Sequence, residues 1–590
     1  MTATDTYMLL RALTDELARC GMTEACTSPG SRSTPLILSL VRESRIQCFS
    51  HIDERCAGFF AVGAAKASRR PVALSCTSGT AAANLTPAVI EAHHARVPLV
   101  VLTADRPPEL RDVGAGQTID QVKLYGGAVK WFFEVGVHDA TPERLRWIRT
   151  LACRAYWTAL TGRAGPVHLN FPLREPLVLD AELPEDPSGR AGGRPYVTLD
   201  APAPAAPKQG DPPTGRVVLV AGGEPGAAQE GERLAAFAAG AQIPLLADPL
   251  SAARRGPAAI AHYDMLLRDP GFADAHRPQF VIRTGELPTS KPLRAWLASL
   301  DSVAQIAIDP DGGWQDPDSV VGMRIAAPFG ALLRPDQSPG DPPPASPMTE
   351  PGWLASWRGA DAAVAEAISE TIGNQLSEPL VAARLTEWLP PEATLFVASS
   401  MPIRDVELLA PAAELAPRII SNRGTNGIDG TVSSAFGAAV ATEGPVVLLI
   451  GDVALAYDIG GLLAARRLHI PMTIVLLNND GGGIFHFLPV AREGEAFEEH
   501  VATPHGLDFA HAAALYGCGY EQPEDAAGLK AAVAASVERR ATTIIEVKTE
   551  RQANLALHRR MADAALAARR AAPRRAGATN RPGPAAAPEA

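Results

Sequence analysis

The sequence predicts an α/β protein with three domains, each built on a mainly parallel sheet flanked by helices. The main observation is that short runs rich in Val, Ile and Leu alternate along the chain with helical patterns, which is typical of parallel sheets. A second is the length of 590 residues, because a single hydrophobic core stops growing well below that size. A third is that two stretches rich in Pro, Gly and Ala divide the chain into blocks of domain size.

These two stretches set the expected domain boundaries. Residues 183–215 are crowded with Pro, Gly and Ala, and residues 334–352 contain SPGDPPPASP, so we expect a linker in each place. The first, central and third domains are then expected over residues 1–182, 216–333 and 353–551.

Each block contains candidate strands. In the first block they are Gln47 to Ile52, Pro71 to Cys76 and Pro98 to Thr103. The central block opens with RVVLVAGG and continues through a helix to IPLLAD. The third holds two buried runs, Val446 to Ile450 and Met472 to Leu477, and closes with TTIIEVK near Lys548. Residues 552–590 are rich in Ala and Arg and then in Pro and Gly, so we expect a tail that is largely disordered.

Composition and charge argue against several classes of function. Hydrophobic residues make up 46% and charged residues 20% of the chain, as in ordinary soluble proteins. The net charge of −11 and the lack of a long basic run argue against nucleic-acid binding, and no apolar run approaches a membrane-spanning length. The N-terminal stretch carries acidic residues in an amphipathic pattern, unlike a signal peptide. The seven cysteines lack metal-type spacing, so we expect buried free thiols in the reducing cytoplasm.

The most informative motif runs from Gly451 to Gly483. It consists of Gly-Asp after a buried run, a helix-length segment, a second buried run, Asn-Asn and glycines. Parallel strands joined by a right-handed crossover end at the same edge of a sheet, so Asp452 and Asn479 can converge there. A carboxylate, an amide oxygen and a backbone carbonyl among the glycines are hard donors suited to Mg²⁺ that carries a phosphate. The alternative is a plain βαβ unit with Asp and Asn in its turns.

Glu54 follows a predicted strand and lies in the first turn of an amphipathic helix. In a structural interpretation, Asp53 caps this helix and Glu54 interacts favourably with the helix dipole. In a functional interpretation, the carboxylate acts in proton transfer at the edge of the sheet. The residue types alone favour the structural interpretation.

Other turns of the first block are candidate anion sites. TSPGSRSTPL, which contains Ser31 and Arg32, and TSGTAAANL both have a strand–turn–helix form, in which backbone N–H groups bind anions. TADRPPEL places Arg106 directly after a strand, and GAGQTIDQ with Gln117 follows. Alternatively, the serines cap helices and the arginines are surface charges.

In the third block, SSMPIRD and SNRGTNGIDG place Arg404 and Arg423 at turns. Two arginines beside the Gly451–Gly483 motif suit bidentate capture of carboxylates, whereas a lone arginine is more often a solvated surface residue. In the central block, RVVLVAGGEPG lacks the full Gly-x-Gly-x-x-Gly pattern, which favours a structural turn.

Taken together, these motifs resemble those of thiamine diphosphate enzymes. The Gly-Asp, the gap and the Asn-Asn are similar to their diphosphate-binding motif, with Val453 where many members have glycine. PGSRSTPL, the DER at residues 53–55, TSGTA, TADRPPEL, SSMPIRD and SNRGTNGIDG resemble the family of 2-succinyl-5-enolpyruvyl-6-hydroxy-3-cyclohexene-1-carboxylate synthases of menaquinone biosynthesis. The resemblance implies pyrimidine-binding, central and diphosphate-binding domains, in that order.

The resemblance also implies roles for individual residues. Asp452, Asn479 and the carbonyl of Gly481 would hold Mg²⁺, or Mn²⁺ in its place, and Glu54 would hydrogen-bond N1′ of the aminopyrimidine ring. The implied cofactor-binding residues are Glu54, Met401, Asn426, Gly427, Ile428, Gly451, Asp452, Val453, Asn479, Gly481, Gly482 and Ile484. The implied catalytic residues are Glu54 and Gln117.

For the substrates, the resemblance assigns Ser400, Arg404 and Arg423 to 2-oxoglutarate and Arg32, Arg106, Gln117 and Lys291 to isochorismate. Ser31 and Phe485 are further implied substrate-binding residues. Relatives often have arginine after the lysine and asparagine before the glutamine, where this chain has Pro292 and Gly116.

The implied activity is decarboxylation of 2-oxoglutarate and conjugate addition of the succinyl unit to isochorismate. It would take place in a homodimer or homotetramer whose active sites are shared between subunits. Two alternatives stay open. One is another thiamine diphosphate enzyme, such as an acetohydroxyacid synthase-like enzyme or a 2-oxoacid decarboxylase, which would need Arg404 and Arg423 less. The other is a non-catalytic binding protein on the same fold.

Overall fold

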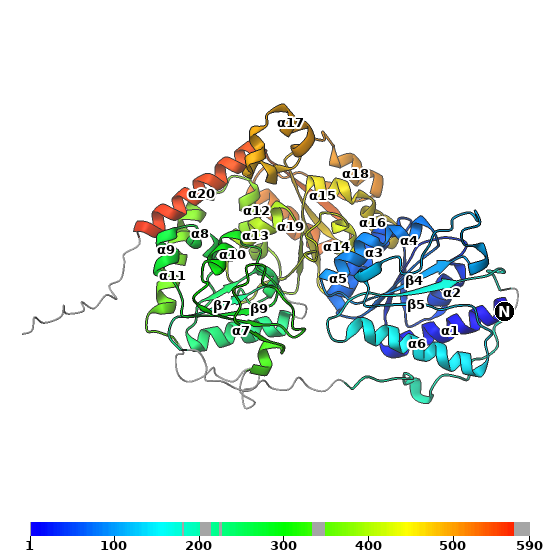
Figure 1. Cartoon of the computed structure of the whole chain (residues 1–590). Coiled ribbons are helices and arrows are strands. Elements are labelled where there is room, and N and C mark those ends of the chain that lie inside the picture. The colour runs from blue at the N-terminus through cyan, green and yellow to red at the C-terminus, as the bar shows by residue number, and fades with distance from the viewer. Residues whose placement is uncertain (1, 180–181, 201–213, 224–226, 333–348, 572–590) are drawn as a thin grey trace, which may run out of the picture.

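The computed structural model describes residues 2–179, 182–200, 214–223, 227–332 and 349–571. It contains three sheets, each flanked by helices, and every strand pairing in them is parallel (Figure 1). The predicted fold class is therefore confirmed. All the candidate strands lie on observed strands.

The first sheet has the strand order β2-β1-β3-β4-β6-β5. Its strands are β1 (Glu24–Thr27), β2 (Gln47–Ser50), β3 (Val72–Cys76), β4 (Leu99–Asp105), β5 (Trp131–Glu134) and β6 (Val167–Pro172). The helices of this domain are α1 (Ala3–Cys20), α2 (Thr34–Arg42), α3 (Glu54–Ser68), α4 (Thr80–Asn84), α5 (Thr86–His94) and α6 (Pro142–Leu160). Every residue of β3 and β4 is buried, because helices cover both faces of the sheet.

The central sheet has the order β11-β10-β9-β7-β8. Its strands are β7 (Val217–Ala221), β8 (Leu245–Ala247), β9 (Phe280–Thr284), β10 (Ala304–Ile308) and β11 (Met323–Ile325). Its helices are α7 (Ala227–Ala241), α8 (Tyr263–Leu267), α9 (Pro270–Ala275) and α10 (Lys291–Ala298).

The third sheet has the order β13-β12-β14-β15-β17-β16, which repeats the topology of the first. Its strands are β12 (Thr394–Val397), β13 (Arg418–Ile420), β14 (Val446–Gly451), β15 (Thr473–Asn478), β16 (Gly519–Glu521) and β17 (Thr543–Lys548). The helices of this part are α11 (Trp353–Ile372), α12 (Glu378–Trp388), α13 (Met401–Leu409), α14 (Thr431–Val440), α15 (Asp452–Tyr457), α16 (Leu463–Leu468), α17 (Glu495–Phe497), α18 (Phe509–Tyr516), α19 (Ala526–Glu538) and α20 (Arg551–Ala571).

The first and third domains meet through α3 and α14. A Cβ atom at Gly63 would lie 1.8 Å from the carbonyl oxygen of Ser434, and one at Gly437 would lie 1.9 Å from that of Phe60. Only glycine permits such a close approach of two helix backbones. The packing fixes α3, which begins at Glu54, against the third domain.

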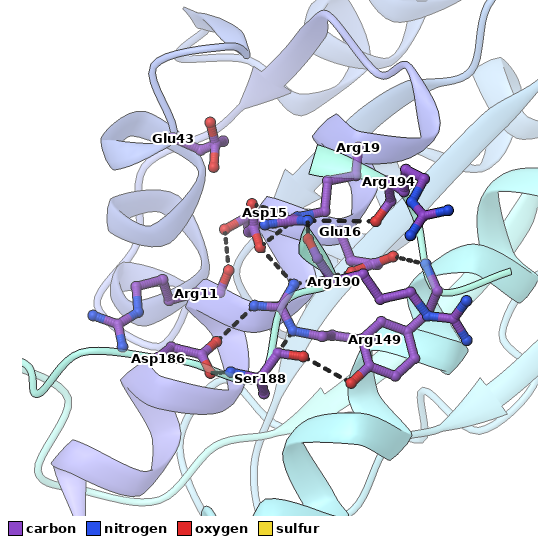
Figure 2. Close-up of polar contacts among 12 residues, drawn as sticks. Arg11, Asp15, Glu16, Arg19, Glu43, Arg149, Asp186, Ser188, Arg190 and Arg194 are labelled. Atoms are coloured by element: carbon purple, nitrogen blue, oxygen red, sulfur yellow. Dashed lines mark hydrogen bonds and ion pairs between the residues drawn. The ribbon is translucent and has the colours of Figure 1, made fainter. Parts of the chain in front are cut away.

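The described part of the first predicted linker lies against the first domain. The buried side chain of Arg149 donates to Glu16 at 2.9 Å and to Asp186 at 2.7 Å, and its Nε donates to Ser188 at 2.9 Å (Figure 2). Because a buried guanidinium needs several acceptors, these bonds hold the segment around residue 186 to α1 and α6. Residues 201–213 of the first predicted linker and residues 334–348 of the second lie outside the described residues.

The prediction of a tail without regular structure from residue 552 is wrong as far as residue 571. The helix α20 runs to Ala571 and packs along α11, with a buried stripe that includes Leu557, Met561 and Ala565 (Figure 1). Alanine and arginine favour helices, and the apolar residues at helical spacing give the helix a surface to bury. Residues 572–590 lie outside the described part. Among the described helices, none has the length and apolarity needed to cross a membrane.

Candidate functional site

The polar residues singled out in the third block lie at one edge of its sheet. Ser399 and Ser400 follow β12, Asp452 follows β14 and Asn479 follows β15. Adjacent strands β12 and β14 form the switch point of the strand order, where open parallel sheets bind ligands.

Asp452 is the centre of this edge. One of its carboxylate oxygens accepts the backbone N–H groups of Asn479 at 3.1 Å and Gly481 at 3.0 Å, and the other accepts that of Val453 at 2.7 Å. Gly481 has a φ of +136°, and a Cβ atom there would lie 2.4 Å from the carbonyl oxygen of Ala502, so glycine is needed for both reasons. The structure thus brings together the three predicted metal ligands, which the sequence separates by up to 29 residues.

This corner fits a divalent cation. The Oδ1 atom of Asn479 is buried and has no hydrogen-bond partner among the described residues. Leaving such an acceptor unsatisfied costs about 1–3 kcal/mol, which a cation would offset. The Gly481 carbonyl accepts the N–H of Gly483 at 2.9 Å and keeps a second lone pair. Gly482 and Ile484 follow in the same turn, with Phe485 exposed beyond them.

The predicted arginine pair lies at the neighbouring strand end. Arg404, on α13, donates to the Ser400 carbonyl at 2.5 Å, and Arg423 donates to the Ser399 hydroxyl at 3.4 Å. Burial and then Arg404 and Arg294 lower the pKa of Arg423, against the nearby carboxylates of Asp248 and Glu91, which raise it. Although Arg404 is exposed, the surrounding protein and then Arg294 lower its pKa too. The three positive charges therefore repel one another and favour an anionic ligand.

Arg294 was missed by the sequence interpretation, which selected Lys291 in the same helix. Lys291 is the exposed first residue of α10, and Arg294 follows it by three positions, a spacing that places both on one helix face. This spacing could have identified Arg294 as a candidate from the sequence.

A second cationic corner lies at the ends of β1, β3 and β4. The buried Arg32 donates to the Leu173 carbonyl at 2.9 Å and lies 3.3 Å from the Glu175 carboxylate. Arg106 donates to Ser78, whose hydroxyl donates to the Gln117 carbonyl at 3.0 Å. Burial and the proximity of Arg32 lower the pKa of Arg106. Ser31 and Gln117 are exposed beside them.

Glu54 is the first residue of α3, and the Asp53 side chain caps the helix by accepting the N–H of Arg55 at 2.8 Å. The Glu54 carboxylate has no hydrogen-bond partner within the described part of the chain. Nearby, Arg55 donates to the Tyr457 carbonyl of α15 at 3.4 Å.

The remaining predicted cofactor residues lie on α13 and on the loop before α14. Met401 is buried at the start of α13, and Ile428 packs partly buried against the core shared by the first and third domains. Asn426 has a φ of +61°, and Gly427 follows it.

The comparisons with known proteins agree with this geometry. Three family models match: the thiamine pyrophosphate enzyme N-terminal binding domain at residues 9–124, the middle domain at residues 203–397 and the C-terminal binding domain at residues 409–547. A 2-succinyl-5-enolpyruvyl-6-hydroxy-3-cyclohexene-1-carboxylate synthase of Bacillus velezensis is 44% identical over 94% of this chain and 96% of its own length. This chain belongs to that synthase family.

Other relatives of the same name extend the match. The synthase of Geobacillus thermodenitrificans is 44% identical, covering 93% of this chain and 94% of its own, and that of Halobacterium salinarum is 40% identical, covering 94% and 97%. A solved structure of a thiamine diphosphate-dependent 4-hydroxybenzoylformate decarboxylase from Rhodococcus jostii has a TM-score of 0.67 over 93% of this chain and 99% of its own. At 20% identity it supports the fold alone.

Two residues at the Asp452 corner of this synthase-family chain were not predicted. The Nε2 atom of His505 lies 3.3 Å from the Asp452 carboxylate, and the Glu378 carboxylate accepts from the Asn479 amide at 2.9 Å. Burial and then the nearby Asp405 raise the pKa of Glu378 to about 7, against the opposing hydrogen bonds from Asn479 and Thr549. Neither residue lies within a motif of the synthase family that the sequence interpretation used.

The cysteines are free thiols, as expected, and five are buried, while Cys48 and Cys518 are half-buried. Against expectation, Cys20 and Cys153 lie together with Glu16 within 4.8 Å, a group that could hold a metal ion. The Glu16 carboxylate already accepts from Arg149, Cys153 and the Tyr196 N–H. These bonds satisfy it without a cation.

Proposed function

We propose that this chain is a thiamine diphosphate-dependent synthase that condenses 2-oxoglutarate with isochorismate and releases CO₂, in menaquinone biosynthesis and in the cytoplasm. The main observation in support is that the metal corner at Asp452 and the arginine pair, Arg404 and Arg423, lie at adjacent strand ends of one sheet. The name that the relatives share states the reaction product.

The cofactor would be held by residues whose positions fit it. Asp452, the Oδ1 atom of Asn479 and the carbonyl of Gly481 would bind Mg²⁺, or Mn²⁺, which in turn binds the diphosphate. When bound, thiamine diphosphate supplies the nucleophile and the electron sink for decarboxylation of a 2-oxoacid. Glu54 would hold the proton shared with N1′ of the pyrimidine ring, because its carboxylate has no hydrogen-bond partner among the residues that the structure describes.

The arginines would bind the carboxylates of the substrates. Arg404 and Arg423 form no ion pair with the described acidic residues, so their charge is available to 2-oxoglutarate. Arg32, Arg106, Gln117 and Lys291 would hold isochorismate, which carries two carboxylates of its own. Ile484 and Phe485 would exclude water beside the reacting atoms.

The direct test is an assay of the purified protein with thiamine diphosphate, Mg²⁺, 2-oxoglutarate and isochorismate, followed by loss of isochorismate absorbance. We expect consumption of isochorismate only when 2-oxoglutarate is present. Turnover of pyruvate without any use of isochorismate would instead identify a different thiamine diphosphate enzyme.

We further propose that a second copy of the chain completes each active site. Ile52, two residues from Glu54, is 63% exposed, and Tyr457 beside Arg55 is 52% exposed, so two large apolar side chains near Glu54 are uncovered in one chain. Covering such a patch with an identical subunit is the common solution.

Subunit mixing tests this arrangement. Glu54→Gln and Asp452→Ala chains, each inactive alone, should regain partial activity when folded together, because one site of each heterodimer then keeps both groups. An absence of activity in verified heterodimers, or turnover by a stable monomer, would refute the shared site.

A further inference from the structure

The side-chain amide of Asn479 has a defined orientation. Its Nδ2 atom donates to Oε1 of Glu378 at 2.9 Å, while its Oδ1 atom is buried without a partner in the described part of the chain. Only the oxygen can ligate a hard cation, yet the two ends of an amide have nearly the same shape. Packing alone therefore does not select the orientation that a metal site needs, and a polar contact must do so.

The side chain of Glu378 is held in place by its surroundings. It is the first residue of α12, is 2% exposed, and follows Ser377, whose side chain caps the helix. The same Oε1 atom also accepts the Thr549 hydroxyl at 2.8 Å, and the Thr549 N–H donates to the Asn478 carbonyl at 2.8 Å. The carboxylate is thus fixed between α12 and the ends of β15 and β17.

We propose that Glu378 is a positioning residue of the metal site, which accepts the Asn479 amide nitrogen and thereby turns the amide oxygen toward the cation. It touches neither cofactor nor substrate and acts through Asn479, as the outer-shell partners of metal ligands do. The inference rests on the proposed function, because that function places the cation at Asp452 and Asn479.

The adjacent residue provides a matched comparison within the same chain. Asn478 donates its Nδ2 to the buried Glu546 at 2.5 Å, but its Oδ1 atom accepts the Asp480 N–H at 3.0 Å. Both asparagines are therefore bonded to a buried glutamate, and only Asn479 keeps a free oxygen. Glu546→Gln is the control for effects of altering a buried carboxylate that are unrelated to metal binding.

The experiment measures Mn²⁺ affinity, without turnover. Free Mn²⁺ is followed by electron paramagnetic resonance in the presence of saturating thiamine diphosphate and no substrate. Glu378→Gln should raise the Mn²⁺ Kd by about 10–100-fold, because a glutamine amide can donate as well as accept and no longer selects the orientation of Asn479. Glu546→Gln should leave the Mn²⁺ Kd unchanged, and thermal melting checks that both variants are folded.

A second background makes the test independent of folding. In Asn479→Asp both carboxylate oxygens can ligate, so the orientation of the side chain at position 479 no longer matters. Adding Glu378→Gln to this variant should not weaken Mn²⁺ binding, and it should relieve the repulsion between the two carboxylates. The inference is overturned if Glu378→Gln leaves the Mn²⁺ Kd unchanged, if Glu546→Gln weakens binding equally, or if the loss persists with Asn479→Asp. A wild-type protein that binds no Mn²⁺ would refute the proposed metal site itself, and with it this inference.

Discussion

Replacing Arg254 with methionine should destabilise the protein and weaken 2-oxoglutarate binding together. Arg254 is buried in the central domain and donates to the carbonyls of Glu407 at 2.9 Å and Ala410 at 3.0 Å, at the C-terminal end of α13. Its other terminal nitrogen donates to the Glu407 carboxylate at 2.9 Å. The opposite end of α13 carries Arg404, with Ser400 just before it, so one side chain of the central domain anchors the helix that carries Arg404.

The size of the effect follows from these contacts. In Arg254→Met the Glu407 carboxylate, only 2% exposed, keeps its Tyr263 hydroxyl bond but loses its counter-charge, and removing one partner of a buried pair costs about 3–5 kcal/mol. The variant also loses four bonds to backbone carbonyls, those of Ala247, Val406, Glu407 and Ala410, at about 0.5–1 kcal/mol each. At about 2–4 °C per kcal/mol, a total loss of roughly 5–9 kcal/mol lowers the Tm by on the order of 10–35 °C.

Calorimetry and steady-state kinetics test the prediction. The matched control is Arg255→Met, because Arg255 pairs at 3.1 Å with Glu232, a side chain that is largely exposed, and an exposed pair contributes about 0–1 kcal/mol. Adding Glu407→Leu to Arg254→Met removes the isolated charge and should restore part of the Tm. The reasoning is refuted if the double variant is less stable than Arg254→Met, or if Arg255→Met loses as much.

Three further predictions concern the same region. Arg404→Ala and Arg423→Ala should each raise the KM for 2-oxoglutarate about ten- to hundredfold, because a charge-assisted contact contributes about 1.5–3 kcal/mol. The KM for isochorismate should rise much less. A larger effect on the KM for isochorismate would reverse the assignment of the two pockets. Ser400 has a φ of 75° and a ψ of −134°, a strain of about 1–3 kcal/mol, so Ser400→Gly should raise the Tm measured by calorimetry, and a lower Tm would contradict the strain. Burial lowers the pKa of His558, but Asp405 at 2.9 Å and the Asn554 carbonyl raise it above its ordinary value. A group whose pKa is raised in the folded protein stabilises the fold fully below about pH 6.5 and less as the pH rises. The Tm difference between wild type and His558→Gln should therefore shrink from about pH 6 upward. A difference that grows with pH would contradict this ion pair.

The parts of the fold that could be predicted from the sequence are those with a local pattern. The buried runs before Asp452 and Asn479 required parallel strands, and their spacing required a crossover, so the convergence of both side chains followed from chain topology. The cap of α3 by Asp53 could likewise be predicted, because it depends only on neighbouring residues. In contrast, α20 was missed because its Ala/Arg-rich composition was given more weight than its buried apolar stripe.

The unpredicted site residues share a physical reason. Glu378 lies 101 positions before Asn479, and Arg294 belongs to another domain than the arginines that it approaches. Such pairings are set by how helices dock on the sheets. The helical spacing from Lys291 could have indicated Arg294 as a candidate, but no periodicity or motif in the chain indicates that it approaches Arg404 and Arg423, or that Glu378 pairs with Asn479.

Pairing distinguishes structural charges from functional ones in this chain. Arg149 and Arg254 are buried and hydrogen-bonded to carboxylates, and Arg254 also to backbone carbonyls, so each joins segments that are distant in sequence. Arg294, Arg404 and Arg423 repel one another and form no ion pair within the described residues, the Oδ1 atom of Asn479 is unsatisfied, and Ser400 is strained. Each of the latter features costs free energy in the chain alone. Their concentration beside a single sheet edge makes sense only if ligands of opposite charge restore that energy, and binding them should therefore stabilise the fold.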